Sequence, residues 1–86
     1  MRDRVLRRGR VIDADGRPVA GAYVSVTWGT APTPDIARKT GEDGVFLVGL
    51  PPGKFRIKAT ASESRAAEVE VDGGEGDEIV ITVKSA

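Results

Sequence analysis

Apolar side chains alternate with polar ones along most of this 86-residue chain. The clearest run is residues 21–29, in which Ala22, Val24, Val26 and Trp28 occupy one set of alternate positions. A period of two places such side chains on one face of a β-strand, and no segment shows helical spacing instead. Between the runs stand clusters of glycine, proline and aspartate, the residue types that reverse a chain tightly. The pattern therefore predicts an all-β protein.

The alternating runs, separated by these turn residues, predict seven short strands. Their expected ranges are 7–14, 21–29, 36–40, 45–50, 54–61, 67–72 and 78–83. Short strands at regular spacing, each with a polar outer face, are typical of antiparallel sheets packed face to face. We therefore expect one domain over residues 1–86, an antiparallel Greek-key-type β-sandwich, with residues 1–4 as a flexible start.

Alternation also assigns individual side chains to faces. Trp28 falls among the apolar positions of its strand, so we expect it in the core. Tyr23 falls on the opposite face of that strand, so the two aromatic residues should not share a surface. Asp13 and Asp43 precede turn glycines, and we expect their carboxylates to accept hydrogen bonds from the turn backbone.

The composition removes most kinds of chemistry. The chain has no cysteine and no histidine, and it has one tyrosine. Disulfides, thiolate metal sites and the commonest general base are therefore excluded. We expect no catalytic residue, no cofactor and no metal site. Two alternatives stay open: weak calcium binding by oxygen ligands in residues 13–16 or 73–78, and acid/base chemistry by carboxylates alone.

The formal net charge is zero, but its distribution is uneven. Six arginines oppose three aspartates in residues 1–17, a net of +3, while residues 62–86 carry seven acidic and two basic residues, a net of −5. The arginines lack interleaved aromatic residues, so we expect no nucleic-acid binding. We expect them to solvate an edge strand or to pair with the acidic end of the chain. Self-association through these opposed charges stays open. No run of 18 apolar residues occurs, so we expect no membrane insertion.

Two motifs resemble one known family. "DADGRPVAGAYV" (residues 13–24) and "DGVFLVGLPPG" (residues 43–53) are similar to the paired motifs of the carboxypeptidase regulatory-like domain. The matching positions are Gly9, Val11, Asp13, Gly16, Pro18, Val19, Gly21, Ala22, Val24, Thr40, Asp43, Gly44, Phe46, Leu50, Pro51, Pro52, Gly53 and Phe55. The resemblance implies a transthyretin-like (prealbumin-like) sandwich.

Activities known on related sandwiches lack their residues here. Transthyretin-like hydroxyisourate hydrolases and intradiol dioxygenases depend on histidines that this chain does not have. Sandwiches of the collagen-adhesin B type form an isopeptide bond between a lysine and an asparagine or aspartate, with a buried glutamate assisting. Val11 and Ala59 occupy the places of that lysine and glutamate, and both are unreactive.

We therefore expect a non-catalytic accessory or structural module that contacts a protein partner or a domain of its parent chain. The candidate contact residues are Arg7, Arg8, Arg10, Tyr23, Glu68 and Glu70. The alternative is a module of a surface or secreted protein that binds carbohydrate or another ligand.

Overall fold

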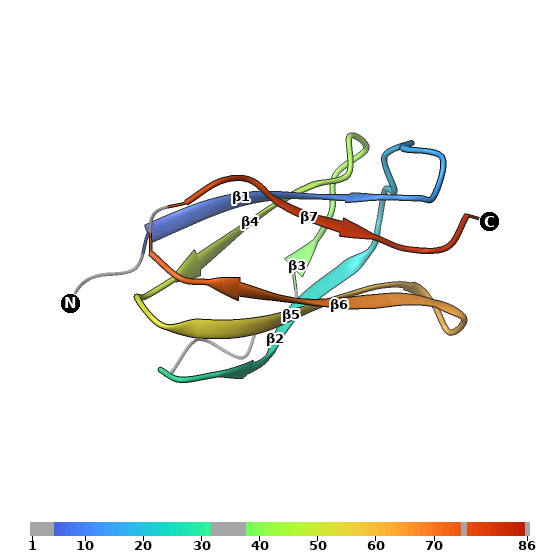
Figure 1. Ribbon diagram of the computed structural model, residues 1–86. Coiled ribbons are helices and arrows are strands. Elements are labelled where there is room, and N and C mark those ends of the chain that lie inside the picture. Colours follow the sequence, from blue (N-terminus) through green and yellow to red (C-terminus); the bar gives the residue numbers. More distant parts are fainter. Residues whose placement is uncertain (1–4, 32–37, 75, 86) are drawn as a thin grey trace.

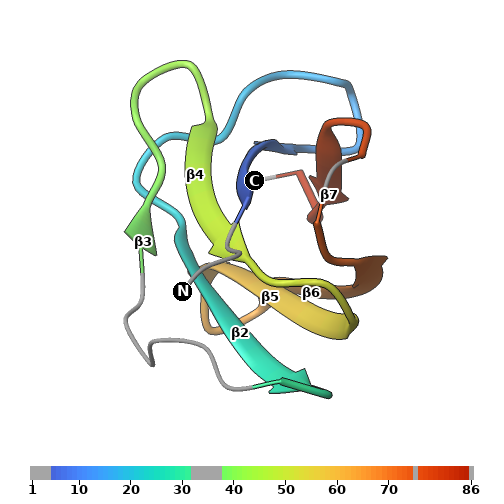
Figure 2. The ribbon, with the colours of Figure 1, turned by 90° about the vertical axis from the view of Figure 1, so that its left-hand side faces the viewer.

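The computed structural model describes residues 5–31, 38–74 and 76–85, so the predicted flexible start at residues 1–4 lies outside the described residues. The strands are β1 (Val5–Ile12), β2 (Tyr23–Gly29), β3 (Arg38–Lys39), β4 (Val45–Leu50), β5 (Lys54–Ser62), β6 (Arg65–Asp72) and β7 (Ile79–Thr82). They form two layers, a sheet of order β4-β1-β7 and a sheet of order β3-β2-β5-β6 (Figures 1 and 2). The predicted all-β sandwich of seven strands is confirmed.

One strand pair departs from the antiparallel prediction. β1 is the central strand of the three-stranded sheet and runs antiparallel to β4 but parallel to β7, with Gly9 opposite Ile79 and Ile12 opposite Thr82. β1 is therefore not the edge strand that its arginines suggested. Side chains alternate in the same way in both kinds of pairing. The sequence pattern consequently carries no signal for the direction of a distant partner strand.

The turn aspartates fix where strands stop and start. The Oδ1 atom of Asp13 accepts hydrogen bonds from the backbone N–H groups of Asp15 at 2.8 Å and Arg17 at 3.0 Å. Oδ1 of Asp43 accepts from the N–H of Val45 at 3.0 Å. These local bonds offer the backbone an alternative to the sheet ladder, so β1 ends at Ile12 instead of residue 14. The predicted role of both aspartates is confirmed.

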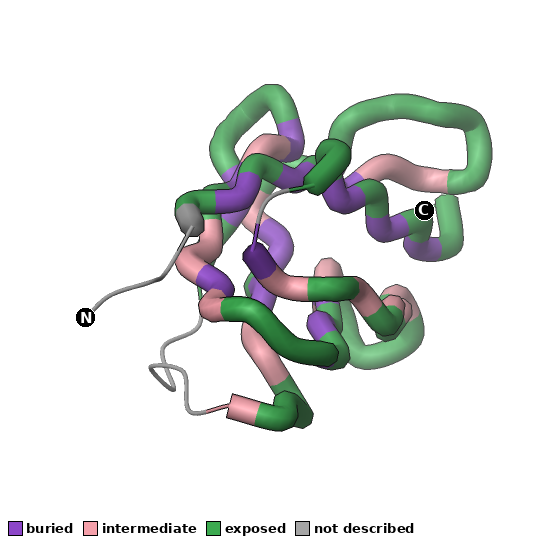
Figure 3. The backbone as a smooth tube through the Cα atoms, turned by 60° about the vertical axis from the view of Figure 1, so that its left-hand side comes forward, coloured by how far each residue is buried: buried purple, intermediate pink, exposed green. Residues whose placement is uncertain are grey.

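The inward side chains of both sheets meet in one core, so buried and exposed positions alternate along the strands (Figure 3). The largest fully buried side chains are Phe55, Leu50, Ile57, Ile81, Val11 and Val24. Burying a side chain of this size stabilises a fold by roughly 1.5–3 kcal/mol. With no cysteine in the chain, this packing holds the two sheets together, while the strand hydrogen bonds hold each sheet by itself.

Gly9 of β1 pairs with Phe46 of β4, and a Cβ atom at position 9 would lie 2.1 Å from Cζ of the Phe46 ring. That ring is buried in the core, so moving it aside would disturb its neighbours. We expect Gly9→Ala to destabilise the domain by about 1–3 kcal/mol, the usual cost of overpacking. Urea unfolding followed by circular dichroism measures the change.

Thr82→Ala is the matched control, because Thr82 is exposed on β7 of the same sheet. It should change the free energy of unfolding by less than about 0.5 kcal/mol. An unchanged urea midpoint for Gly9→Ala would show that the ring can move aside.

Candidate functional site

A β-bulge near the end of β2 changes the face of the sheet on which the side chains of its last residues lie. Val26 pairs with Ile57 and Trp28 pairs with Arg56, so Thr27 is an extra residue without a partner in the ladder. After an inserted residue, the side chains that follow switch faces. Trp28 therefore lies on the outer face beside Arg56, and its residue is 47% exposed. The prediction that Trp28 belongs to the core is wrong, because strict alternation does not allow for the bulge.

The inward position opposite Phe55 is taken by Gly29 instead. A Cβ atom at position 29 would lie 2.4 Å from Cδ1 of Phe55, so the ring uses the space that any side chain would need. A regular strand would put Trp28 in this place, against a ring that is already fully buried. The bulge thus allows Phe55 to stay in the core while Trp28 points to the surface.

Tyr23 and Trp28 share the outer face of the four-stranded sheet as a result. Tyr23 is 55% exposed and pairs with Thr60 of β5, an outward position like that of Arg56. The expectation that the two aromatic residues lie on opposite faces is therefore wrong. A cation accompanies each ring: Nζ of Lys39 lies 5.6 Å from the Tyr23 ring centroid, and Cζ of Arg56 lies 5.4 Å from that of Trp28. We call Tyr23, Trp28, Lys39 and Arg56 the aromatic face.

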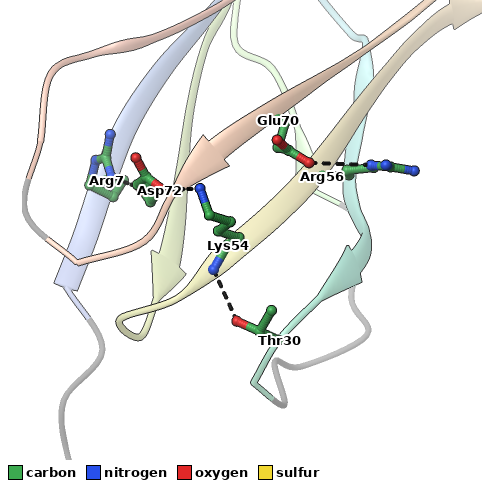
Figure 4. A network of polar contacts seen from close by, with 6 residues as sticks. All are labelled: Arg7, Thr30, Lys54, Arg56, Glu70 and Asp72. Atoms are coloured by element: carbon green, nitrogen blue, oxygen red, sulfur yellow. Dashed lines mark hydrogen bonds and ion pairs between the residues drawn. The ribbon is translucent and has the colours of Figure 1, made fainter.

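Two columns of opposite charge continue this outer face across β5 and β6. Lys54 stands opposite Asp72, Arg56 opposite Glu70 and Lys58 opposite Glu68. The Nζ–Oδ1 distance of the first pair is 3.4 Å and the Nε–Oε2 distance of the second is 3.7 Å (Figure 4). The carboxylate of Glu68 accepts a hydrogen bond from the hydroxyl of Thr27. Such exposed pairs add little stability, so they chiefly determine the surface that a partner meets.

Arg7 occupies a different place altogether. Its residue is only 7% exposed and points inward at one end of the sandwich. Its Nη1 atom donates to the backbone carbonyls of Asp72 at 2.7 Å and Gly74 at 3.0 Å, and Nη2 donates to that of Asp77 at 2.7 Å. Arg7 therefore fastens the β6–β7 connection (Figure 4) and is not available to a partner. Alternation along β1 places Arg7 on the same face as Val11, but no local pattern indicates the carbonyl groups that accept its hydrogen bonds.

Arg8 and Arg10 lie on the opposite side of the sandwich, on the outer face of the three-stranded sheet. Nε of Arg10 lies 3.0 Å from Oε1 of Glu78, and Nε of Arg8 lies 3.5 Å from Oε2 of the same carboxylate. The prediction that the N-terminal arginines pair with the acidic end of the chain is confirmed. The six candidate contact residues thus fall in three places, and Tyr23, Glu68 and Glu70 are the three that share one face.

Within the described ranges, no group of three or more acidic side chains gathers where a metal ion could be held. The described part of the chain also contains no helix long and apolar enough to cross a bilayer. Fold and surface together define a small sandwich module whose polar side chains serve turns, strand pairs and outer faces.

The chain belongs to the carboxypeptidase regulatory-like domain family, whose sequence profile matches residues 8–84. The resemblance of the two motifs is thereby confirmed. Domains of this family are non-catalytic β-sandwiches. No curated protein matches the sequence.

The facing of Trp28 can be tested by fluorescence, because it is the only tryptophan in the chain. An exposed indole under a guanidinium should be quenched more strongly by iodide than by caesium, since the positive charge concentrates anions locally. Arg56→Glu should reverse that preference while circular dichroism stays unchanged. Weak quenching by both ions would place the indole in the core.

The role of Arg7 can be tested against its neighbour. Arg7→Met leaves three carbonyl groups without their donor, so we expect a loss of about 2–4 kcal/mol in the free energy of unfolding. Arg8→Met removes a similar side chain from an exposed pair and should cost less than about 1 kcal/mol. Equal urea midpoints for the two variants would contradict the role assigned to Arg7.

Proposed function

We propose that this domain is a non-catalytic contact module that docks a protein partner, or a domain of its parent chain, through the aromatic face. The observation that carries the proposal is the pair of exposed aromatic side chains, Tyr23 and Trp28, on one face of one sheet. Tyrosine, tryptophan and arginine are the residue types most enriched at the centres of protein interfaces. All three occur here within one group.

The surroundings of the aromatic face resemble the polar rim of an interface. Lys54 and Asp72 form an exposed pair at one end, and Glu68 and Glu70 line the β6 side. A surface with one row of positive and one row of negative side chains favours a partner whose charges are arranged in the complementary way. It disfavours the same partner when it is shifted by one position. The charges would therefore set the register of docking, while the aromatic residues supply most of the affinity.

The chemistry of the chain supports a non-catalytic role. The hydroxyl groups have no histidine to activate them, because the sequence contains none. Asp13 and Asp43 serve their turns, and Glu70 and Asp72 stand beside cations. The non-catalytic character of the family points in the same direction.

Carbohydrate binding is the second candidate, and the shared facing of Tyr23 and Trp28 favours it. Four paired positions of β2 separate the two residues, or about 13 Å of strand. Sugar rings stack on open aromatic faces, but Lys39 and Arg56 each lie over one of these rings. We therefore rank a protein partner first.

Site-specific photocrosslinking in the source cells tests the proposal. A photoreactive phenylalanine analogue in place of Tyr23 should give a discrete protein adduct, and Trp28→Ala should remove that adduct. The same analogue in place of Leu47, which is exposed on the outer face of the other sheet, is the matched control.

Adducts from neither position, or equally from both, would contradict docking through the aromatic face. A saturable change of Trp28 emission on titration with soluble glycans, without any protein adduct, would favour the second candidate instead.

A further inference from the structure

β6 is a long strand with one open side. It pairs with β5 along eight residues, and no other strand of the described structure pairs with it. β6 and β7 are edge strands of the two sheets on the same side of the sandwich (Figure 2). The two edges are joined near both ends of β6: Nη1 of Arg7 donates to the carbonyl of Asp72, and Nε of Arg65 donates to that of Lys84 at 2.7 Å. Between these two hydrogen bonds, no strand among residues 5–31, 38–74 and 76–85 pairs with the outer edge of β6.

The hydrogen-bonding pattern shows which backbone groups point to the open side. The N–H of Lys54 donates to Oγ1 of Thr30, and the C=O of Lys54 accepts from the N–H of Thr30. Both groups therefore point to the β2 side, so Lys54 exchanges no backbone hydrogen bonds with Asp72 opposite. Antiparallel pairs alternate between bonded and non-bonded. The N–H and C=O groups of Glu68 and Glu70 therefore point away from β5, as the carbonyl of Asp72 does toward Arg7.

The side chains of β6 alternate strictly. Glu68 and Glu70 lie on the outer face with Asp72, while Val69 and Val71 point inward and stay only partly buried. The inward residues Phe55 and Ile57 of the neighbouring strand β5 are fully buried. The inward residues of β5 from Phe55 to Ala59 are thus covered, whereas those of β6 are only partly covered, and one more strand would cover them.

The charges on β6 indicate which kind of strand could pair with this edge. A second copy of β6 would bring carboxylates beside carboxylates, and like charges on neighbouring strands repel. β5 shows the pattern that does fit: its Lys54, Arg56 and Lys58 face the three acidic residues, and its apolar residues face the core. We propose that β6 binds an extended segment of a partner protein with alternating cationic and apolar side chains, added antiparallel as a fifth strand of the sheet.

Carboxylates on an edge strand also protect it from aggregation, and that alone would explain their presence. The partly buried valines distinguish strand addition from protection against aggregation, since such protection does not require an apolar face that is only partly covered. The proposed strand addition rests on the proposed contact role of the domain. It uses backbone groups of β6 and not the aromatic face, so either can fail without the other.

A synthetic peptide with the sequence of residues 54–59, KFRIKA, tests the proposal on the isotope-labelled domain. At a peptide concentration of ten times Kd, amide exchange at Glu68 and Glu70 should slow about tenfold, while Val69 and Val71, already bonded to β5, should change little. The charge-reversed peptide EFEIEA is the matched control and should not bind.

The Glu68→Gln, Glu70→Gln double variant of the domain should weaken binding of KFRIKA about tenfold, as expected for two exposed charge contacts.

N-methylated peptides separate strand addition from simple charge attraction without altering the protein. In antiparallel pairing, the cationic residues of the peptide would bond to Glu68 and Glu70. Methyl groups on their nitrogens should abolish binding, and methyl groups on the apolar residues should not. Equal binding of both methylated peptides, or binding without amide protection at Glu68 and Glu70, would overturn the proposal.

Absence of binding by KFRIKA would also overturn it and would leave aggregation protection as the role of the carboxylates. Trp28→Ala should leave peptide binding unchanged. A loss of peptide binding in that variant would contradict strand addition at β6 and assign the peptide to the aromatic face. A negative peptide result leaves the crosslinking test of the aromatic face unaffected.

Discussion

The space around Phe55 constrains the path of the chain at two separate places. The ring is fully buried, and glycines approach it from two segments: Gly29 on β2 and Gly73 after β6. A Cβ atom at position 73 would lie 2.7 Å from Cε2 of the ring and 1.9 Å from the carbonyl oxygen of Pro51. Because close packing leaves no spare volume in a core of this size, the chain must bring backbone to the ring at both places. The bulge in β2 and the path of the β6–β7 connection both follow from this requirement.

At the same end of the sandwich, the Arg7 side chain joins the two sheets through hydrogen bonds. The connection after β6 turns the carbonyls of Asp72, Gly74 and Asp77 toward one guanidinium. A Cβ atom at Gly76 would lie 2.9 Å from Nη2 of Arg7, so the backbone passes directly over the charged group. A planar group with several donors can bind carbonyls from different directions, which a lysine could not do equally well. An arginine of β1 thus fixes the distance between the two sheets where apolar packing ends.

The architecture could be predicted from the sequence because most strands obey the period of two without interruption. Phe46, Leu50, Phe55 and Ile57 are buried where alternation places them. The facing of Trp28 could not be predicted, since one inserted residue in β2 changes the phase and only the partner strand reveals it. The hydrogen-bond partners of Arg7 and the parallel β1–β7 pair were equally inaccessible. Both depend on segments about 70 residues apart in sequence, for which local patterns carry no signal.

The bulge in β2 and the open edge of β6 define the two surfaces at which we propose partner contacts. The bulge moves a tryptophan from the core to the surface without changing the pairing of β5 and β6, so the aromatic face arises at no loss of core packing. The same sheet ends at β6, where acidic residues and partly buried valines occur on opposite sides of one strand. A strand added there would extend the outer face by one column and leave Tyr23 and Trp28 exposed, because β5 lies between them and the edge. The two proposed contacts differ in chemistry and would therefore not exclude each other on one sheet.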